Sequence, residues 1–159
     1  MVSPLDVGVP LDDPWFGYAN TVVEVIGPNA GVAVRAAPAG DVGVWPWATE
    51  AALFVLTAWD PGEVRFSVEV NRARQSALDA ELRPRAESTW RARGVDPSTG
   101  YGDEGVAVRG LAESDVCEIG ARYGQDAVFA WTPRAWMIIA CVGARRLSLG
   151  WRITPIRAS

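Results

Sequence analysis

A chain of 159 residues, 49% hydrophobic and 21% charged, is long enough for one folded domain with a real core. Its formal net charge of -4 argues against unspecific binding to nucleic acid or to an anionic membrane. The chain has no His and all 15 basic residues are Arg, so imidazole bases, imidazole zinc ligands and lysine Schiff bases are excluded.

The compartment is inferred from the start of the chain and from the cysteines. No basic region followed by an apolar stretch opens the sequence, and no apolar run reaches membrane-spanning length. Cys117 and Cys141 fall in a predicted helix and an apolar strand, where small buried thiols are ordinary. We therefore expect a cytoplasmic protein with no cofactor, no metal and no membrane contact.

The first half of the chain predicts an arm followed by strands. Residues 1–17, with three Pro and the pair Asp12-Asp13, are expected to form an irregular N-terminal arm held to the body by Trp15 and Phe16, while residues 18–159 form a single domain. Strands are predicted at 20–26 and 31–35, joined by a turn at 27–30. After a loop, the apolar run 51–59 predicts a central strand covered on both faces.

The second half adds two helices and further strands. One helix is predicted between the N-cap Ser67 and Pro84, with Val70, Ala73, Ala77, Leu78 and Leu82 inward and Asn71, Gln75, Asp79 and Arg83 on the opposite face. Strands follow at 87–93 and 105–109, then a helix at 113–123 ended by Gly124, then strands at 127–131, 135–142 and 147–151. This order predicts an α/β (α+β) fold, a helix-on-sheet sandwich with a ferredoxin-like split βαβ core and extra β-strands at both ends.

One segment, about Leu56 to Ala130, carries motifs of a known family. These are the stretch Leu56-Thr57-Ala58-Trp59-Asp60-Pro61-Gly62, then Asn71 and Arg74, residues 105–111, and the stretch Tyr123-Gly124-Gln125-Asp126-Ala127-Val128-Phe129. The segment resembles the bacterial domain-of-unknown-function family 3293. The chain has Asp60 where that family has Asn, and Tyr101 where a Trp is expected ahead of Glu104. The resemblance implies an order of elements and no activity.

Asp60 and Glu104 are the candidate catalytic residues. Asp60 ends a central strand, where open α/β sheets hold ligands, although Asp60-Pro61-Gly62 also fits a simple turn. Glu104 forms a pair with Asp103 that repulsion could restrict to one shared proton. Neighbours in a strand point to opposite faces, however, so a structural or solvent-exposed role is the alternative.

The candidate binding residues are polar groups near Asp60 and three tryptophans. Asn71 and Arg74 are expected either to face the end of the central strand or to lie on a solvated helix surface, and Gln125 either joins them or ties a turn to the backbone. The tryptophans are Trp59 and the loop pair Trp45 and Trp47. That pair is expected to form the lip of a pocket or partner surface, or else to be buried against the sheet.

Three hypotheses of function follow. The leading one is a non-catalytic binding or protein-interaction module, a regulator or an immunity-type partner, whose protein or small-molecule partner is unidentified. It predicts an exposed apolar patch around Trp45 and Trp47. The alternative is a small metal-independent enzyme using carboxylate acid-base chemistry, and it predicts that the polar candidates converge in one pocket. A single-stranded nucleic-acid binder is the third and is disfavoured by the acidic balance.

Overall fold

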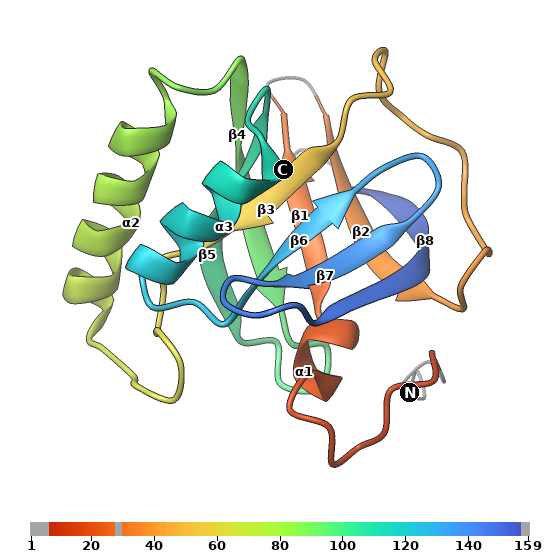
Figure 1. Cartoon of the computed structure of the whole chain (residues 1–159), viewed down its shortest axis with the longest axis horizontal. Coiled ribbons are helices and arrows are strands. Elements are labelled where there is room, and N and C mark those ends of the chain that lie inside the picture. The colour runs from red at the N-terminus through yellow and green to blue at the C-terminus, as the bar shows by residue number, and fades with distance from the viewer. Residues whose placement is uncertain (1–6, 28–29, 157–159) are drawn as a thin grey trace.

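Eight antiparallel strands form a closed barrel in the computed structural model, which describes residues 7–27 and 30–156 (Figure 1). Around the barrel the neighbours run in the order β1-β2-β8-β7-β6-β3-β5-β4, and β4 returns to β1. The strands are β1 (Val22–Ile26), β2 (Gly31–Ala37), β3 (Leu53–Leu56), β4 (Ser88–Val95), β5 (Gly102–Arg109), β6 (Ala127–Trp131), β7 (Trp136–Ala140) and β8 (Arg146–Ile156). The helices are α1 (Phe16–Ala19), α2 (Val68–Leu82) and α3 (Glu113–Arg122).

The predicted helix-on-sheet sandwich with a ferredoxin-like core is therefore wrong. The strands expected as additions at both ends of the chain instead close the sheet, because β2 pairs with β8 from Gly31↔Ile156 to Ala37↔Gly150 and β1 pairs with β4. Closure satisfies the backbone groups that an open sheet would leave at its edges. The two long helices cover only one side of the barrel wall (Figure 1).

Two hydrophobic cores result from the alternation of side chains along the strands. On β3, Leu53 and Val55 belong to the core inside the barrel. Phe54 and Leu56 belong to the core between the barrel wall and the helices. The expectation that this strand is covered on both faces is confirmed, since all four of its residues are buried.

Helix α2 buries a different face from the one predicted. Leu78 and Leu82 pack against the barrel wall as expected, and Ser67 caps the first turn by accepting a hydrogen bond from the Val70 amide. Val70, predicted inward, is 43% exposed, whereas Asn71, predicted outward, is 1% exposed. Polar side chains are buried at the start of this helix because they bind the neighbouring loop, as described below.

The ends of the barrel are closed in different ways. Trp131, the last residue of β6, lies among the indoles of Trp45, Trp136 and Trp151, which fill one end. The loop 38–52 that carries Trp45 runs outside the barrel from the end of β2 to the start of β3 (Figure 1). The other end, where β6 starts and β3 ends, is covered in part by α1 and remains hollow.

The N-terminal arm is attached to the barrel. Residues 7–15 contain no helix or strand, yet Trp15 is buried, Phe16 is half-buried, and the Arg145 guanidinium stacks on the Trp15 ring and pairs with Asp13. Residues 1–6 of the predicted arm and 28–29 of the predicted turn lie outside the described residues. Within the described part of the chain, no helix is both long and apolar enough to cross a membrane.

Candidate functional site

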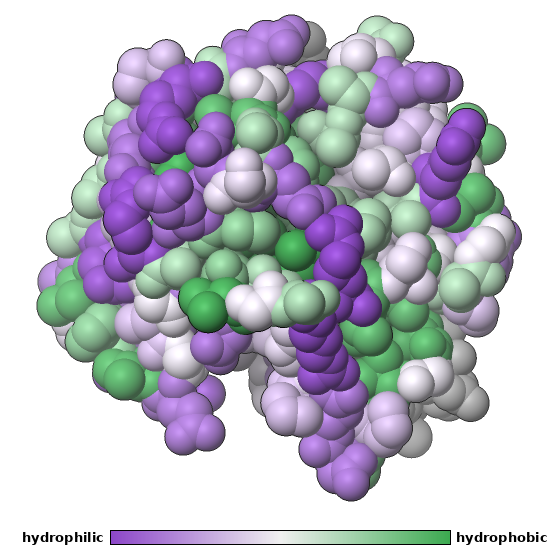
Figure 2. All heavy atoms as spheres, viewed as in Figure 1, coloured by the Kyte–Doolittle hydropathy of each residue, from purple (hydrophilic) through white to green (hydrophobic). Residues whose placement is uncertain are grey.

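A cavity of about 250 Å³ occupies the hollow end of the barrel, which we call the mouth. The loops that surround it follow β3, join β4 to β5 and precede β6, and α1 lies across it. Figure 2 shows an indentation at the lower edge of the molecule, the end at which α1 lies in Figure 1. Its lining combines aromatic rings and carboxylates, among them Tyr18, Trp59, Asp60, Asp96, Tyr101, Asp103 and Phe129.

Asp103 is a charged residue on the strand face that points into the barrel. It shares the inward face of β5 with Gly105 and Ala107, and Ala107 is part of the interior core. The Asp103 Oδ1 atom is shielded from solvent and has no hydrogen-bond partner in the described structure. Burial, together with the negative charge of Asp60, raises the pKa of Asp103 to about 6. The carboxyl therefore titrates near pH 6 and has no hydrogen-bond or ionic partner among residues 7–27 and 30–156.

Space around Asp103 is left by glycine. The residue opposite Asp103 on β4 is Gly94, so no cross-strand side chain covers the carboxyl, and Gly105 follows on the same face of β5. Tyr18 and Phe129 line the cavity with their rings 6.3 Å apart and nearly perpendicular. Burial and nearby acidic groups raise the pKa of Tyr18 to about 12, so its hydroxyl remains protonated.

Asp60 lies at the rim with its carboxylate fully used by the protein. Oδ1 accepts hydrogen bonds from the Phe66 amide and from the Asn71 amide nitrogen, both at 2.9 Å, and Oδ2 accepts one from the Tyr101 hydroxyl at 2.9 Å. Burial alone would raise the pKa of Asp60. The three hydrogen bonds and the nearby Arg65 outweigh burial, so the pKa lies below its usual value. The loop is thus tied to α2 through an ionised carboxylate.

The other polar candidates hold the loop that follows β3. Asn71 also accepts a hydrogen bond from the Asp60 amide, and Arg74 donates to the carbonyls of Ala58 and Tyr123. Gln125, directly after the C-terminal turn of α3, donates to the Trp59 carbonyl at 3.2 Å. Their polar groups support the rim of the mouth, and Gln125 also lines the cavity.

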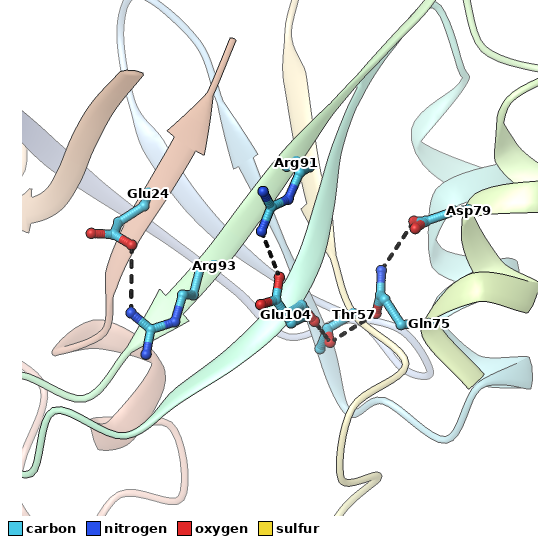
Figure 3. Close-up of polar contacts among 7 residues, drawn as sticks. All are labelled: Glu24, Thr57, Gln75, Asp79, Arg91, Arg93 and Glu104. Carbon is cyan, nitrogen blue, oxygen red and sulfur yellow. Dashed lines mark hydrogen bonds and ion pairs between the residues drawn. The ribbon is translucent and has the colours of Figure 1, made fainter. Parts of the chain in front are cut away.

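Glu104 is placed on the outer surface of the barrel, away from the mouth. Its carboxylate lies 3.7 Å from the Arg91 guanidinium of β4, and both side chains are substantially exposed. Figure 3 shows this pair beside a second cross-strand pair, Arg93 and Glu24. Of the two adjacent carboxylates on β5, the structure brings Asp103 and not Glu104 to the cavity.

The tryptophan candidates separate into two places. Trp59 lines the mouth, and its indole N–H donates to the Tyr101 hydroxyl at 3.2 Å. Trp45 and Trp47 are half-buried at the opposite end, where both rings contact Trp131. Their indoles pack against the core inside the barrel, while part of each side chain remains exposed.

Most residues of the mouth are not among the sequence candidates, and Asp103, Tyr18 and Tyr101 are three of them. The sequence identifies Asp103 as half of a carboxylate pair. Gly102 and Gly105 on either side of the pair have no side chains to fill space, which is a signal that the strand borders a cavity. Tyr18 lies in a segment without periodicity and offers no signal, whereas Tyr101 is marked only by the family resemblance, which expects Trp at its place. Among the described residues, no group of three or more His, Cys, Asp or Glu is placed to hold a metal ion.

Fold and site together define a small antiparallel β-barrel with an acidic, aromatic-lined mouth. Residues 56–128 match the model of a family described as "Protein of unknown function (DUF3293)", which confirms the resemblance over that segment. The matched segment contains Asp60, Asn71, Arg74, Asp103 and Gln125, and it leaves β1, β2, β7 and β8 outside. No curated protein and no solved structure matches the chain.

Proposed function

We propose that this protein is a non-catalytic binding module that holds a small organic cation in the mouth of the barrel. The observation that carries the proposal is the Asp103 carboxyl, which faces a cavity of about 250 Å³ and has an unpartnered, solvent-shielded oxygen. An unpaired buried carboxylate costs free energy, and a bound cation with N–H donors offsets that cost.

The charges around the cavity support a cationic ligand. Among the described residues, its lining includes the carboxylates of Asp60, Asp96 and Asp103 and no Arg. Arg65 lies over the Tyr101 ring, 5.3 Å from its centroid, and its charge lowers the pKa of Asp103 by less than burial and Asp60 raise it. A cleft lined by one sign of charge attracts ligands of the opposite sign.

The shape and the rings support a small, partly aromatic ligand. The cavity is slightly smaller than the range of about 300–1,000 Å³ that is usual for drug-sized molecules. Tyr18, Trp59 and Phe129 line it, and aromatic faces attract organic ammonium groups. An ammonium group on a single ring fits both the size and the chemistry.

Binding is favoured over chemistry because most polar groups of the site are already engaged. Asp60, Asn71 and Gln125 hold the backbone of the rim, and this leaves Asp103 as one anchor. A binding site needs few such groups, whereas acid-base catalysis needs two or more aimed at a substrate. The two cysteines are free, which fits a protein of the reducing cytoplasm.

The test is an NMR titration of the Asp103 carboxyl carbon with and without benzylammonium chloride. Because a bound cation stabilises the ionised carboxylate, we expect the pKa of Asp103 to fall from about 6 by at least half a unit, with a smaller effect at Asp12, which is exposed. A pKa of Asp103 that does not respond to saturating benzylammonium would refute the proposal.

Acid-base catalysis is the second candidate, and one observation favours it. Asp60 has a lowered pKa and Asp103 a raised one within the same mouth, a separation typical of catalytic carboxylate pairs. Incubation of a metabolite extract with the protein and with Asp103→Asn, followed by mass spectrometry, tests it. A compound consumed only by the unsubstituted protein would support an enzyme, and unchanged extracts would leave binding as the function.

A further inference from the structure

A second charged residue, at the other end of β5, is buried with no hydrogen-bond acceptor or carboxylate beside it in the described part of the chain. Arg109, the last residue of that strand, shares its inward face with Asp103 and is 7% exposed. Its Nε and Nη2 atoms are shielded from solvent, have no hydrogen-bond partner and form no ion pair within the described residues. Arg109 lies six positions beyond Asp103 along the strand, a span of about 20 Å, so the two sites are distinct.

Arg109 lies in a stack of planar groups. Its guanidinium carbon is 5.3 Å from the centroid of the Trp90 ring, and the Trp90 ring is 6.1 Å from the ring of Trp47 at an angle of 30°. The Trp47 indole nitrogen is also shielded and without a partner. The stack therefore presents three unused N–H donor atoms from two side chains and no acceptor of its own.

The two unpaired nitrogens of Arg109 have a definite chemical preference. Nε and Nη2 form one edge of the guanidinium, and this edge presents two parallel N–H groups that match the two oxygens of a carboxylate. A carboxylate in the guanidinium plane continues the stack over the indoles, because it is planar as well. A tetrahedral phosphate would direct oxygens out of that plane toward the ring faces, which repel negative charge.

We propose that this end of the barrel binds a carboxylate group, held in two hydrogen bonds by Arg109 and flanked by Trp47 and Trp90. The carboxylate supplies the acceptors and the negative charge that the buried guanidinium lacks. This site is independent of the mouth, which is acidic.

Because the edge of Arg109 is shielded, a carboxylate can enter only when a neighbouring segment moves, and the segment that carries Trp47 is the loop 38–52. Trp47 belongs to that loop, whose middle is held by few bonds, chiefly the Trp45 indole N–H to the Thr49 carbonyl and the Ala51 amide to the Thr49 hydroxyl. Movement of this loop also separates the Trp47 ring from Trp90 and Trp131, so carboxylate binding has to offset the loss of that packing.

The test is thermal unfolding of the full chain in sodium benzoate, compared with sodium chloride at the same ionic strength. Binding only to the folded state raises the melting temperature, and we expect a rise of about 3 °C at ten times the dissociation constant. Arg109→Gln should abolish the rise. Should that variant fail to fold, Arg109→Lys keeps the charge, removes the two-pronged edge and should weaken benzoate binding at least tenfold.

Arg145→Gln is the matched control, because Arg145 also stacks on an indole, that of Trp15, but is paired with Asp13. Its response to benzoate should equal that of the unsubstituted protein, and so should that of Asp103→Asn. No rise in the unsubstituted protein, or an equal rise in Arg109→Gln or Arg109→Lys, would overturn the proposal. An equal rise with inorganic phosphate would overturn the assignment to a carboxylate.

Discussion

Two adjacent residues of β5, Asp103 and Glu104, show what can be inferred about this site from sequence. The pair is identifiable as chemically interesting, and period-two alternation correctly separates its members onto opposite faces. In Gly102-Asp103-Glu104-Gly105, each face of the strand carries one acid and one glycine. Alternation alone therefore does not decide which of the two faces lies inside. The structure resolves this, since Asp103 faces the mouth and Glu104 pairs with Arg91 outside.

Asp103→Asn should make the protein more stable at neutral pH. The pKa of Asp103 is about 6 in the folded protein against 3.8 for an ordinary Asp, so the carboxyl binds its proton more tightly when folded. Its ionisation therefore lowers stability as pH rises from about 4 to 6, and the loss is complete above 6. The full shift corresponds to about 3 kcal/mol, which partial solvent exposure reduces to about 1–2 kcal/mol.

Urea denaturation at pH 7.5 and pH 4.5 measures this effect. The gain from Asp103→Asn should be about 1–2 kcal/mol at pH 7.5 and markedly smaller at pH 4.5. Asp12→Asn makes the same chemical change at an exposed position and serves as the control. A destabilised Asp103→Asn protein at pH 7.5 would mean that the carboxylate has a partner inside the protein.

Helix α2 shows why an element can be predicted while its buried face is not. Its bounds agree closely with the interval between Ser67 and Pro84, since capping and proline chemistry are local. Hydrophobicity alone predicts a buried face that has Val70 inward and Asn71 outward. The amide of Asn71 instead satisfies a loop that only the tertiary structure brings near, so the polar residue is buried and the valine exposed.

Replacing Asn71 and Val70 one at a time tests which of the two side chains is buried. Asn71→Ala removes the hydrogen bonds to the Asp60 amide and carboxylate and should lower the free energy of unfolding by about 2–3 kcal/mol. Val70→Ala, one residue earlier, should cost less than about 0.5 kcal/mol because its side chain is exposed. Chemical denaturation of both variants compares them, and the reverse order of the two costs would contradict the assigned face.

At the scale of the whole molecule, the barrel depends on strand pairs that are remote in the sequence. Most strands, taken one at a time, are recognisable from apolar runs and turn residues, and the family resemblance correctly covers the middle of the chain. The pairs β2 with β8 and β1 with β4 connect opposite parts of the chain, and no local pattern specifies them. Closure, and with it the mouth, could not be predicted for this reason.

Deletion of residues 146–159 tests closure. The deletion removes β8, which pairs with both β7 and β2, and it removes Trp151, which is fully buried inside the barrel. Because it opens the barrel and its core, we expect loss of cooperative thermal unfolding, measured by near-ultraviolet circular dichroism. Thr154→Ala, an exposed position on the same strand, should unfold cooperatively. Cooperative unfolding of the truncated chain would instead indicate that β8 is an accessory strand.

The central claim, that the mouth binds a small organic cation through Asp103, is tested most directly by calorimetric titration with benzylammonium chloride at pH 7.5. The comparison uses the unsubstituted protein, Asp103→Asn and Glu104→Gln, two neutralising changes on adjacent residues that face opposite sides of β5. We expect saturable one-to-one binding by the unsubstituted protein and by Glu104→Gln, and at least tenfold weaker binding by Asp103→Asn. Equal affinity for all three proteins, or no binding by any, would contradict the account.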